Sequence, residues 1–325
     1  MAVFTPLELN DISEWIASDF AIGKAVSLRG IHGGIENSNF FLDTELANQQ
    51  QEFVLTIFER LSAEQLPYYL ELMRHLANKG IPVPKPIENK FGDILFSLQG
   101  KPAAIVTKLP GLSRLDPKAH HCALVGDMLA KMHLASADFP HTQVNLRSLS
   151  WWQNTIPQVL PHLSENQKTV LTKELQTQEQ FFASDAYASL PQSASHCDLF
   201  RDNVLFDPKN QSDTTQDQLG GFFDFYFAGT DKCLFDLAVT ANDWCLAENK
   251  KDLDPERLAA LMDAYQAIRP LTVNEKISWS MMLRAAALRF WVSRLWDFYL
   301  PRNAHMLTPH DPSHFEYILL SRQET

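Results

Sequence analysis

Cysteine is scarce in this chain: its 325 residues include only four, Cys122, Cys197, Cys233 and Cys245. They are widely spaced, and no two of them form a Cys-x-x-Cys pair. Disulfide scaffolds and cysteine-based zinc sites use more cysteines at closer spacing. The sequence therefore favours reduced thiols and a cytoplasmic protein.

Long apolar runs and an excess of basic residues are also lacking. No run of about 18 apolar residues occurs, so we expect no segment that spans a membrane. The start, Met1–Pro6, has neither the basic nor the apolar segment of a signal peptide. The formal net charge of -11 argues against a nucleic acid held on a basic face. We therefore expect neither a membrane nor a nucleic acid as partner.

Residues 196–206 combine acidic, amide and apolar side chains in an informative order. The stretch contains His196, Asp198 and Asn203 in the pattern His-x-Asp-x-x-x-x-Asn, and Asp224 follows about twenty residues later. A His-x-Asp pair by itself often marks only a turn or a cap. Phosphoryl transfer needs the whole set, because one carboxylate meets the substrate hydroxyl while amide and carboxylate oxygens hold Mg²⁺ beside the phosphates.

Together these residues resemble the catalytic loop and the metal-binding Asp of the protein-kinase-like phosphotransferases, in particular the aminoglycoside phosphotransferase and choline kinase branch. The resemblance implies that Asp198 is catalytic, that Asn203 and Asp224 hold the metal, and that ATP and Mg²⁺ are the cofactors. It also implies structural roles for His196 and for Asp236, which lies twelve residues after Asp224 and braces the loop by hydrogen bonding.

The fold that this resemblance implies is α+β and bilobal. Residues 1–109 form a small nucleotide-binding lobe with an antiparallel sheet of about five strands plus helices. Residues 110–325 form a large, mostly helical lobe for catalysis and substrate binding. Two capping sequences predict helix starts: one at Thr5-Pro6-Leu7-Glu8, with Pro6 as the first helical residue, and one at Thr272-x-x-Glu275.

Nucleotide contacts are expected in the first hairpin of the small lobe and at the lobe's last strand. The hairpin offers adjacent glycines and short polar side chains, whose backbone N–H groups suit phosphate oxygens. Thr56 stands where related phosphotransferases carry Lys, so the phosphates lack that cation. At the end of the last strand, a plain turn explains the Pro-Gly pair as well as a nucleotide contact does. The expected nucleotide-binding residues are Gly33, Gly34, Asn37, Ser38, Asn39, Thr56, Lys108 and Leu109.

Beyond the fold, the whole chain resembles the homoserine kinases of the aminoglycoside-phosphotransferase-like type. The stretches that carry this resemblance are residues 36–42, 53–59, 80–84, 119–122, 196–203, 224–226, 242–245 and 287–291. The implied reaction moves the γ-phosphoryl group of ATP to the hydroxyl of L-homoserine. The product is O-phospho-L-homoserine, on the route to threonine.

A site for homoserine, a small zwitterion, needs a cation for the carboxylate and oxygen atoms for the ammonium. The candidates are Arg201, Asp202 and Asp243, which lie near the catalytic loop or on the following helix, with Arg289 behind them. Each of them is also explained by a purely structural ion pair. Phe200 replaces a charged residue of many relatives, so we expect turnover to depend strongly on magnesium.

Two other functions stay open on the sequence. A kinase of the same fold acting on choline, methylthioribose or an aminoglycoside is the first, and Tyr226, Trp244 and Trp291 are aromatic residues that suit a quaternary ammonium. The second is a catalytically inactive, kinase-like nucleotide-binding protein, for which the missing Lys at Thr56 argues. The intact set of Asp198, Asn203 and Asp224 argues against inactivity.

Overall fold

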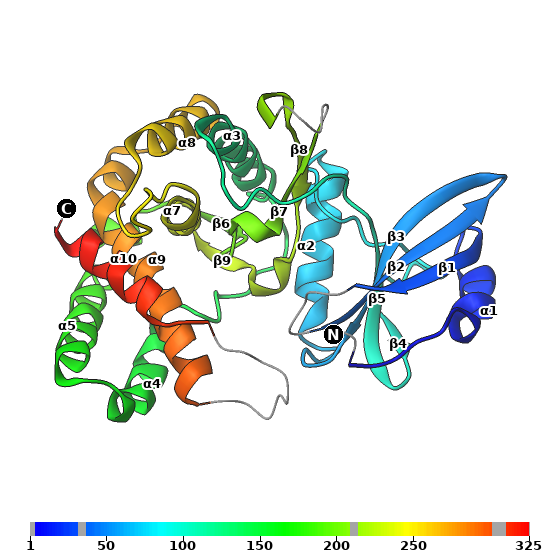
Figure 1. The fold of residues 1–325 in the computed structure, drawn as a ribbon, viewed down its shortest axis with the longest axis horizontal. Coiled ribbons are helices and arrows are strands. Elements are labelled where there is room, and N and C mark those ends of the chain that lie inside the picture. The colour runs from blue at the N-terminus through cyan, green and yellow to red at the C-terminus, as the bar shows by residue number, and fades with distance from the viewer. Residues whose placement is uncertain (1–3, 32–36, 209–213, 301–309, 325) are drawn as a thin grey trace. The chain divides into compact units, whose positions relative to one another are not determined.

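A computed structural model describes residues 4–31, 37–208, 214–300 and 310–324 of the chain. It divides into two compact units, Met1–Pro110 and Gly111–Thr325, which are described in turn (Figure 1). The first contains a five-stranded antiparallel sheet and the second is mostly helical, which confirms the predicted α+β class.

The first unit is built on one antiparallel sheet with the strand order β1-β2-β3-β5-β4. The strands are β1 (Lys24–Gly30), β2 (Asn37–Leu46), β3 (Gln49–Phe58), β4 (Phe96–Leu98) and β5 (Lys101–Thr107). The helices of this unit are α1 (Leu9–Asp19) and α2 (Leu66–Asn78). All neighbouring strand pairs of this sheet except β3–β5 are consecutive in sequence, so connections between successive strands set most of the register.

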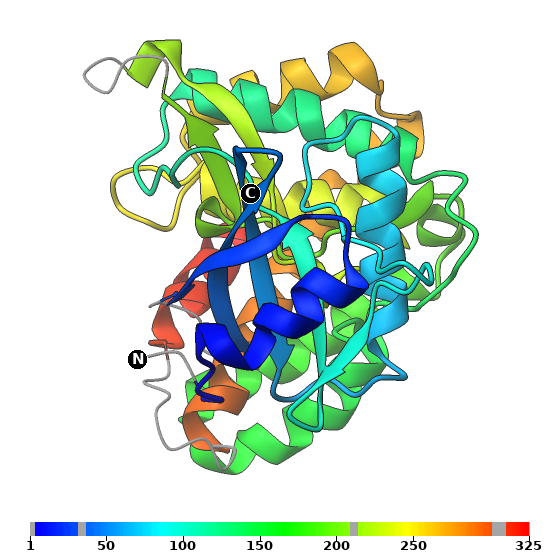
Figure 2. The same cartoon turned by 90° about the vertical axis from the view of Figure 1, so that its right-hand side faces the viewer.

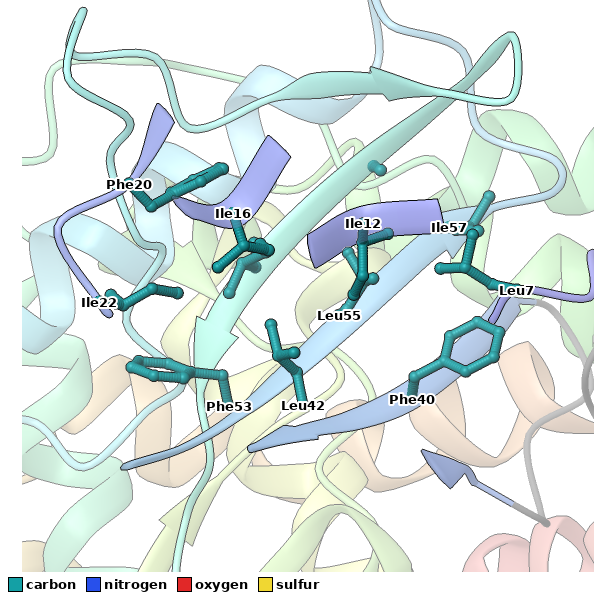
Figure 3. Close-up of a cluster of buried hydrophobic side chains, with 12 residues drawn as sticks. Leu7, Ile12, Ile16, Phe20, Ile22, Phe40, Leu42, Phe53, Leu55 and Ile57 are labelled. Carbon is teal, nitrogen blue, oxygen red and sulfur yellow. The ribbon is translucent and has the colours of Figure 1, made fainter. Parts of the chain in front are cut away.

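Helix α1 lies across one face of this sheet (Figure 2). Ile12 and Ile16 are one turn apart, are fully buried and point at the strands (Figure 3). Alternation along β2 turns Phe40 and Leu42 toward them, and Leu55 of β3 completes the centre of the cluster. Each such buried side chain contributes about 1.5–3 kcal/mol of transfer free energy, so this face anchors the unit.

The predicted first helix start is wrong. The helix begins at Leu9 instead of Pro6, and the Glu8 N–H donates to Asp11 Oδ2 at 2.8 Å. The Thr5 hydroxyl is used elsewhere, because it donates to Glu59 Oε1 at 2.7 Å. A contact far along the chain has therefore replaced the local cap.

The second unit consists of helices and two short antiparallel ribbons, β6 with β9 and β7 with β8 (Figure 1). Its helices are α3 (Ala119–Ala135), α4 (Leu149–Val159), α5 (Glu165–Phe182), α6 (Asp185–Ala188), α7 (Cys233–Trp244), α8 (Pro255–Ile268), α9 (Val273–Tyr299) and α10 (Ser313–Glu324). Its strands are β6 (Gln192–Ser195), β7 (Val204–Asp207), β8 (Gln218–Phe222) and β9 (Gly229–Lys232). Among the described helices, none combines the length and apolar character needed to cross a bilayer.

Helix α7 is the centre of this unit. All twelve of its residues are buried, and α3, α8 and α9 pack against it. Helices α3 and α8 approach closely at Gly126, where an added Cβ would lie 2.3 Å from the Leu261 carbonyl oxygen. Helix α9 begins at the predicted cap, with the Glu275 N–H donating to Thr272 Oγ1 at 3.2 Å. Because α7 is enclosed, the charged residues on it need partners inside the unit.

Candidate active site

The β7–β8 ribbon brings two predicted metal ligands to one end of a hairpin. Its register pairs Val204 with Phe222, so Asn203, just before β7, lies beside the residues just after β8. The Phe223 N–H donates to the Asn203 carbonyl oxygen at 3.0 Å, and Asp224 follows at once. Asp224 has a left-handed backbone with φ of 63° and an exposed side chain. The hairpin thereby places Asn203 and Asp224 at the same end.

Asp198 is tied to the same place through Asn203. The Asn203 side chain donates from Nδ2 to the Asp198 carbonyl oxygen at 2.8 Å, which closes the loop between them. The Phe200 N–H donates to that same oxygen, also at 2.8 Å. A short 3₁₀ turn over Arg201–Asn203 then leads into β7. The spacing of five residues is therefore what this closed loop requires.

Asp236 of α7 lies directly beneath the loop. Its Oδ2 accepts from the His196 N–H and its Oδ1 from the Cys197 N–H, both at 2.8 Å. Cys197 has a φ of 62°, a strained value for a residue other than glycine, immediately before Asp198. The paired hydrogen bonds hold this conformation in place.

A second helix supports the same carboxylate. His133 of α3 contacts Asp236 Oδ2 through Nε2 at 3.1 Å, and its Nδ1 lies 2.7 Å from the Tyr265 hydroxyl. Burial opposes ionisation of Asp236, but the hydrogen bond and the charge of His133 hold the pKa of this carboxyl below its ordinary value. His133 was missed as a site residue, since nothing local in the sequence indicates its partner.

The His196 ring links the loop that carries Asp198 to the end of β8. Its Nε2 lies 2.9 Å from the Phe223 carbonyl oxygen, which can only accept, so Nε2 carries the proton. Burial lowers the pKa of the His196 imidazole, and the ring is therefore neutral at physiological pH. His196 and Asp236 thus hold the two ends of the site together without facing a substrate.

Two of the expected substrate-binding residues engage each other. Arg201 donates from Nε and Nη2 to the two carboxylate oxygens of Asp243, at 3.0 and 3.1 Å. The Arg201 N–H also donates to Asp243 Oδ2 at 2.8 Å, and Nη1 reaches the Leu115 carbonyl oxygen. This two-pronged ion pair fixes the loop to α7. Asp202, by contrast, has an exposed side chain.

Helix α9 supplies the remaining candidate, Arg289. Its Nη2 lies 3.3 Å from Asp198 Oδ1, and its side chain is only 4% exposed. Burial lowers the pKa of the guanidinium, although the nearby Asp198 opposes this. Arg289 therefore lies next to the carboxylate that the sequence predicts to be catalytic, 91 positions earlier in the chain.

Phe200, the apolar replacement, packs against helices α9 and α10. Its ring centroid lies 4.4 Å from that of Phe290 and 6.0 Å from that of Phe315. Phe290 and Phe315 stack on each other at 5.1 Å. The three rings hold the middle of the loop against the C-terminal helices, a packing role that a charged residue would not fill.

The first unit's candidates lie on β2, β3 and the end of β5. The Thr56 hydroxyl donates to Asn39 Oδ1 at 2.7 Å across the β2–β3 pair, and Asn37 begins β2. The Lys108 ammonium pairs with the Glu52 carboxylate at 2.6 Å.

The remaining candidates for nucleotide binding are Ser38, Leu109, Gly33 and Gly34. The Ser38 side chain is fully used, because its oxygen accepts from the Phe4 and Thr5 N–H groups and donates to Glu59. Leu109 follows β5 with a half-buried side chain. Gly33 and Gly34 lie outside the described residues.

The sequence matches the model of the phosphotransferase enzyme family over residues 27–271. Since this match covers most of the chain, the chain belongs to that family. Several relatives that match it over nearly the full length are named homoserine kinase. The protein of that name from Cupriavidus taiwanensis is 60% identical and covers 99% of this chain and 95% of its own length. Those from Ralstonia pickettii and Burkholderia multivorans are each 56% identical over 99% of this chain and 96% of their own.

Solved structures agree on the fold. An amicoumacin kinase in complex with AMP-PNP and Ca²⁺ has a TM-score of 0.70 at 14% identity, covering 98% of this chain and 93% of its own. Choline kinase from Cryptosporidium parvum has a TM-score of 0.61 at 14% identity, covering 97% and 93%. At these identities the likeness concerns the fold alone, and it confirms the protein-kinase-like architecture.

Proposed function

We propose that this chain transfers the γ-phosphoryl group of ATP to the hydroxyl of L-homoserine, giving O-phospho-L-homoserine on the route to threonine. The observation that carries the proposal is 60% identity, over 99% of the chain, to a protein named homoserine kinase. The arrangement of Asp198, Asn203 and Asp224 around one hairpin supports it, because phosphoryl transfer needs those oxygen atoms close together.

Asp198 is the group that we assign to the acceptor. The homoserine hydroxyl oxygen forms a bond to the γ-phosphorus while the bond between that phosphorus and ADP breaks. The hydroxyl proton passes to the Asp198 carboxylate, so the charges and atoms balance. The loop that carries Asp198 is held by Asn203 and Asp236, which keeps the carboxylate in one position before the acceptor arrives.

The oxygen atoms of Asn203 and Asp224 fit a magnesium ion. Mg²⁺ prefers oxygen ligands and keeps several waters, so an amide and a carboxylate suffice beside phosphate oxygens. Because Asn203 donates from Nδ2 to Asp198, its Oδ1 is the atom that remains to face a metal. We assign Asn203 and Asp224 as metal ligands. When bound, the ion neutralises charge on the phosphates.

We assign the nucleotide-binding role to residues 1–109 and the catalytic and substrate-binding roles to residues 110–325. For the phosphates we propose the start of β2, with Asn37, Asn39 and Thr56, together with Gly33 and Gly34. Support comes from the Thr56–Asn39 hydrogen bond, which keeps two polar side chains together at one place on the sheet.

We assign the end of β5 to binding the adenine base of the nucleotide. For the adenine edge we propose the backbone at Lys108 and Leu109, since both follow the last strand of the sheet. Ser38 acts by holding the chain start to β2, because its hydroxyl is already bound to Thr5 and Glu59.

For homoserine we propose Arg289 at the carboxylate and Asp202 at the ammonium. Arg201 and Asp243 already bind each other, so we assign them to holding the loop. Alanine at Arg289 or Asp202 should raise the homoserine KM more than the ATP KM. Unchanged KM values would show that the substituted residue does not bind homoserine. If only Arg201→Ala raised the homoserine KM, Arg201 would instead be assigned to the substrate site.

The choline alternative loses two of its three aromatic residues. Trp244 and Trp291 are fully buried, and Trp244 Nε1 donates to the Leu199 carbonyl oxygen at 3.0 Å. A quaternary ammonium needs accessible ring faces, which these two side chains do not offer. No observation in the described residues favours an acceptor other than homoserine.

Turnover by the purified protein tests the proposal. Magnesium-ATP is offered with L-homoserine, choline, methylthioribose and an aminoglycoside, and ADP release is followed. We expect homoserine alone to be phosphorylated, and Asp198→Ala to lower kcat by about 100-fold or more. Asp263→Ala is the matched control, since Asp263 is an exposed carboxylate on α8. Comparable rates in the two variants would refute the role of Asp198, and nucleotide binding without turnover of any alcohol would favour an inactive protein.

A further inference from the structure

Arg289 is a buried cation whose hydrogen bonds the described chain does not complete. Its side chain is 4% exposed, and its counter-ion is Asp198, whose Oδ1 lies 3.3 Å from Arg289 Nη2. Its Nε has no hydrogen-bond partner among the described residues. A guanidinium carries five N–H donors and does not lose its charge in proteins. An unused donor on a buried charge is costly, so this edge of Arg289 is suited to an acceptor from outside the chain.

Two aromatic rings and the Asp198 carboxylate lie around the Arg289 guanidinium. The guanidinium carbon lies 3.7 Å from the ring centroid of Phe290 and 5.3 Å from that of Phe227. Asp198 Oδ1 lies 3.3 Å from Nη2, and Nε is the donor that remains for a ligand. A carboxylate binds an arginine in the plane of the guanidinium with two parallel hydrogen bonds.

The other two arginines of α9 are satisfied differently. Arg284 donates from Nε and Nη2 to the buried carboxylate of Glu174. Arg294 is half-buried and lies over the Phe315 ring at 4.7 Å. Arg289 is therefore the arginine of this helix that combines near-complete burial, an unused donor and contact with the catalytic carboxylate.

The charge on Arg289 matters during the reaction. Before transfer, Asp198 is its counter-ion. When Asp198 takes the hydroxyl proton it becomes neutral, and Arg289 is left as a buried cation without a counter-charge. A buried charge that loses its partner is strongly unfavourable. An acceptor that carries its own carboxylate supplies the missing negative charge at that moment.

We propose that Arg289 binds the carboxylate of the acceptor at its Nε edge, and that this carboxylate speeds turnover as well as strengthening binding. The enzyme would then select hydroxy amino acids and reject plain amino alcohols. In homoserine, three carbons separate the hydroxyl from the carboxylate, a span short enough for one end to face Asp198 and the other the adjoining guanidinium. This inference rests on the proposed function and deepens it, since it gives the contact between Arg289 and the acceptor carboxylate a role in turnover and in the choice of acceptor class.

Two acceptors that differ only in the carboxylate test the idea. L-Homoserine and 3-aminopropan-1-ol are compared in the native protein, in Arg289→Met and in Arg289→Lys, with saturating magnesium-ATP. In the native protein we expect kcat for homoserine to exceed that for the amino alcohol by about 100-fold, the effect of an uncompensated buried charge. Arg289→Met should reduce this ratio to within about tenfold, mainly through a lower kcat for homoserine. Arg289→Lys keeps the charge without the two-pronged geometry and should recover part of the homoserine turnover.

Arg294→Met is the matched control, because it removes a second arginine from the same helix and should leave the ratio unchanged. Thermal melting and binding of an ATP analogue check that each variant is folded. An unchanged ratio in Arg289→Met, or equal kcat values for the two acceptors in the native protein, overturns the inference. The native comparison decides even where a variant does not fold. Absence of any homoserine turnover by the native protein would instead refute the proposed function, and the role of Arg289 with it.

Discussion

Asp236→Asn is the sharpest perturbation of the catalytic loop that the chain offers. The carboxylate is fully buried and receives three donors: the His196 and Cys197 N–H groups at 2.8 Å and His133 Nε2 at 3.1 Å. Asparagine has the same shape but replaces one accepting oxygen with an NH₂ group, which cannot accept. At least one donor is then left unpaired in a buried site, and the others lose a charged acceptor.

The size of the effect follows from these contacts. A buried donor without a partner costs about 1–3 kcal/mol, and a hydrogen bond to a charged group is worth about 1 kcal/mol more than one to a neutral group. We therefore expect Asp236→Asn to lower the free energy of unfolding by about 3 kcal/mol. Asp198 follows Cys197 directly, so kcat should fall by about 100-fold, as for a reacting group displaced by about 1 Å.

Denaturant unfolding followed by tryptophan fluorescence measures the stability change. Six of the seven tryptophans lie beyond residue 110, so the signal reports mainly the unit that contains Asp236. Asp263→Asn is the control, because it makes the same change of charge at an exposed position of α8. A loss below about 0.5 kcal/mol in Asp236→Asn, within the range of surface substitutions, would refute our account of the loop.

The native protein and Asp236→Asn should also differ in how their stability depends on pH. The pKa of Asp236 is lowered in the folded state, so its ionised form stabilises the fold above the unfolded pKa of about 3.9. That contribution is lost as the pH falls through the lower folded pKa, and asparagine does not titrate. The stability difference between the native protein and Asp236→Asn should therefore be largest above about pH 5 and shrink below about pH 4. A difference that grows on acidification would contradict the sign.

Three further outcomes are expected. Phe200→Ala removes one ring from the stack on α9 and α10 and should cost about 2–3 kcal/mol of stability, measured by the same unfolding assay; Phe200→Leu should cost less, and equal losses would contradict the stacking argument. Gly111→Ala should destabilise by about 2 kcal/mol or more, because φ is 102° and a Cβ would lie 2.2 Å from the Phe206 carbonyl oxygen; a melting temperature equal to that of the native protein would show that no clash occurs. Chelation of Mg²⁺ should abolish turnover without changing far-ultraviolet circular dichroism, and Asp224→Asn should raise the magnesium concentration needed for half-maximal rate; a rate that barely responds to the metal would refute this assignment.

The two predicted helix starts show that a local capping sequence does not by itself determine where a helix begins. Two capping sequences looked alike on the chain, yet only Thr272 caps its helix. Thr5 instead donates to Glu59, which is 54 positions away. A cap competes with every other acceptor that folding brings near, and the sequence around Thr5 does not show that competitor.

The sequence by itself determined the class of the protein, the sheet of about five strands and the spacing of the catalytic loop. It could do so because the contact between Asn203 and Asp198 closes over five residues, and strand alternation and hairpins are also local. Only the tertiary structure decided which side chains are partners. Asp236 of α7 contacts His133 of α3, 103 positions away in the sequence. Arg289 of α9 contacts Asp198, 91 positions away. Such pairings depend on how the helices pack, which no local spacing encodes.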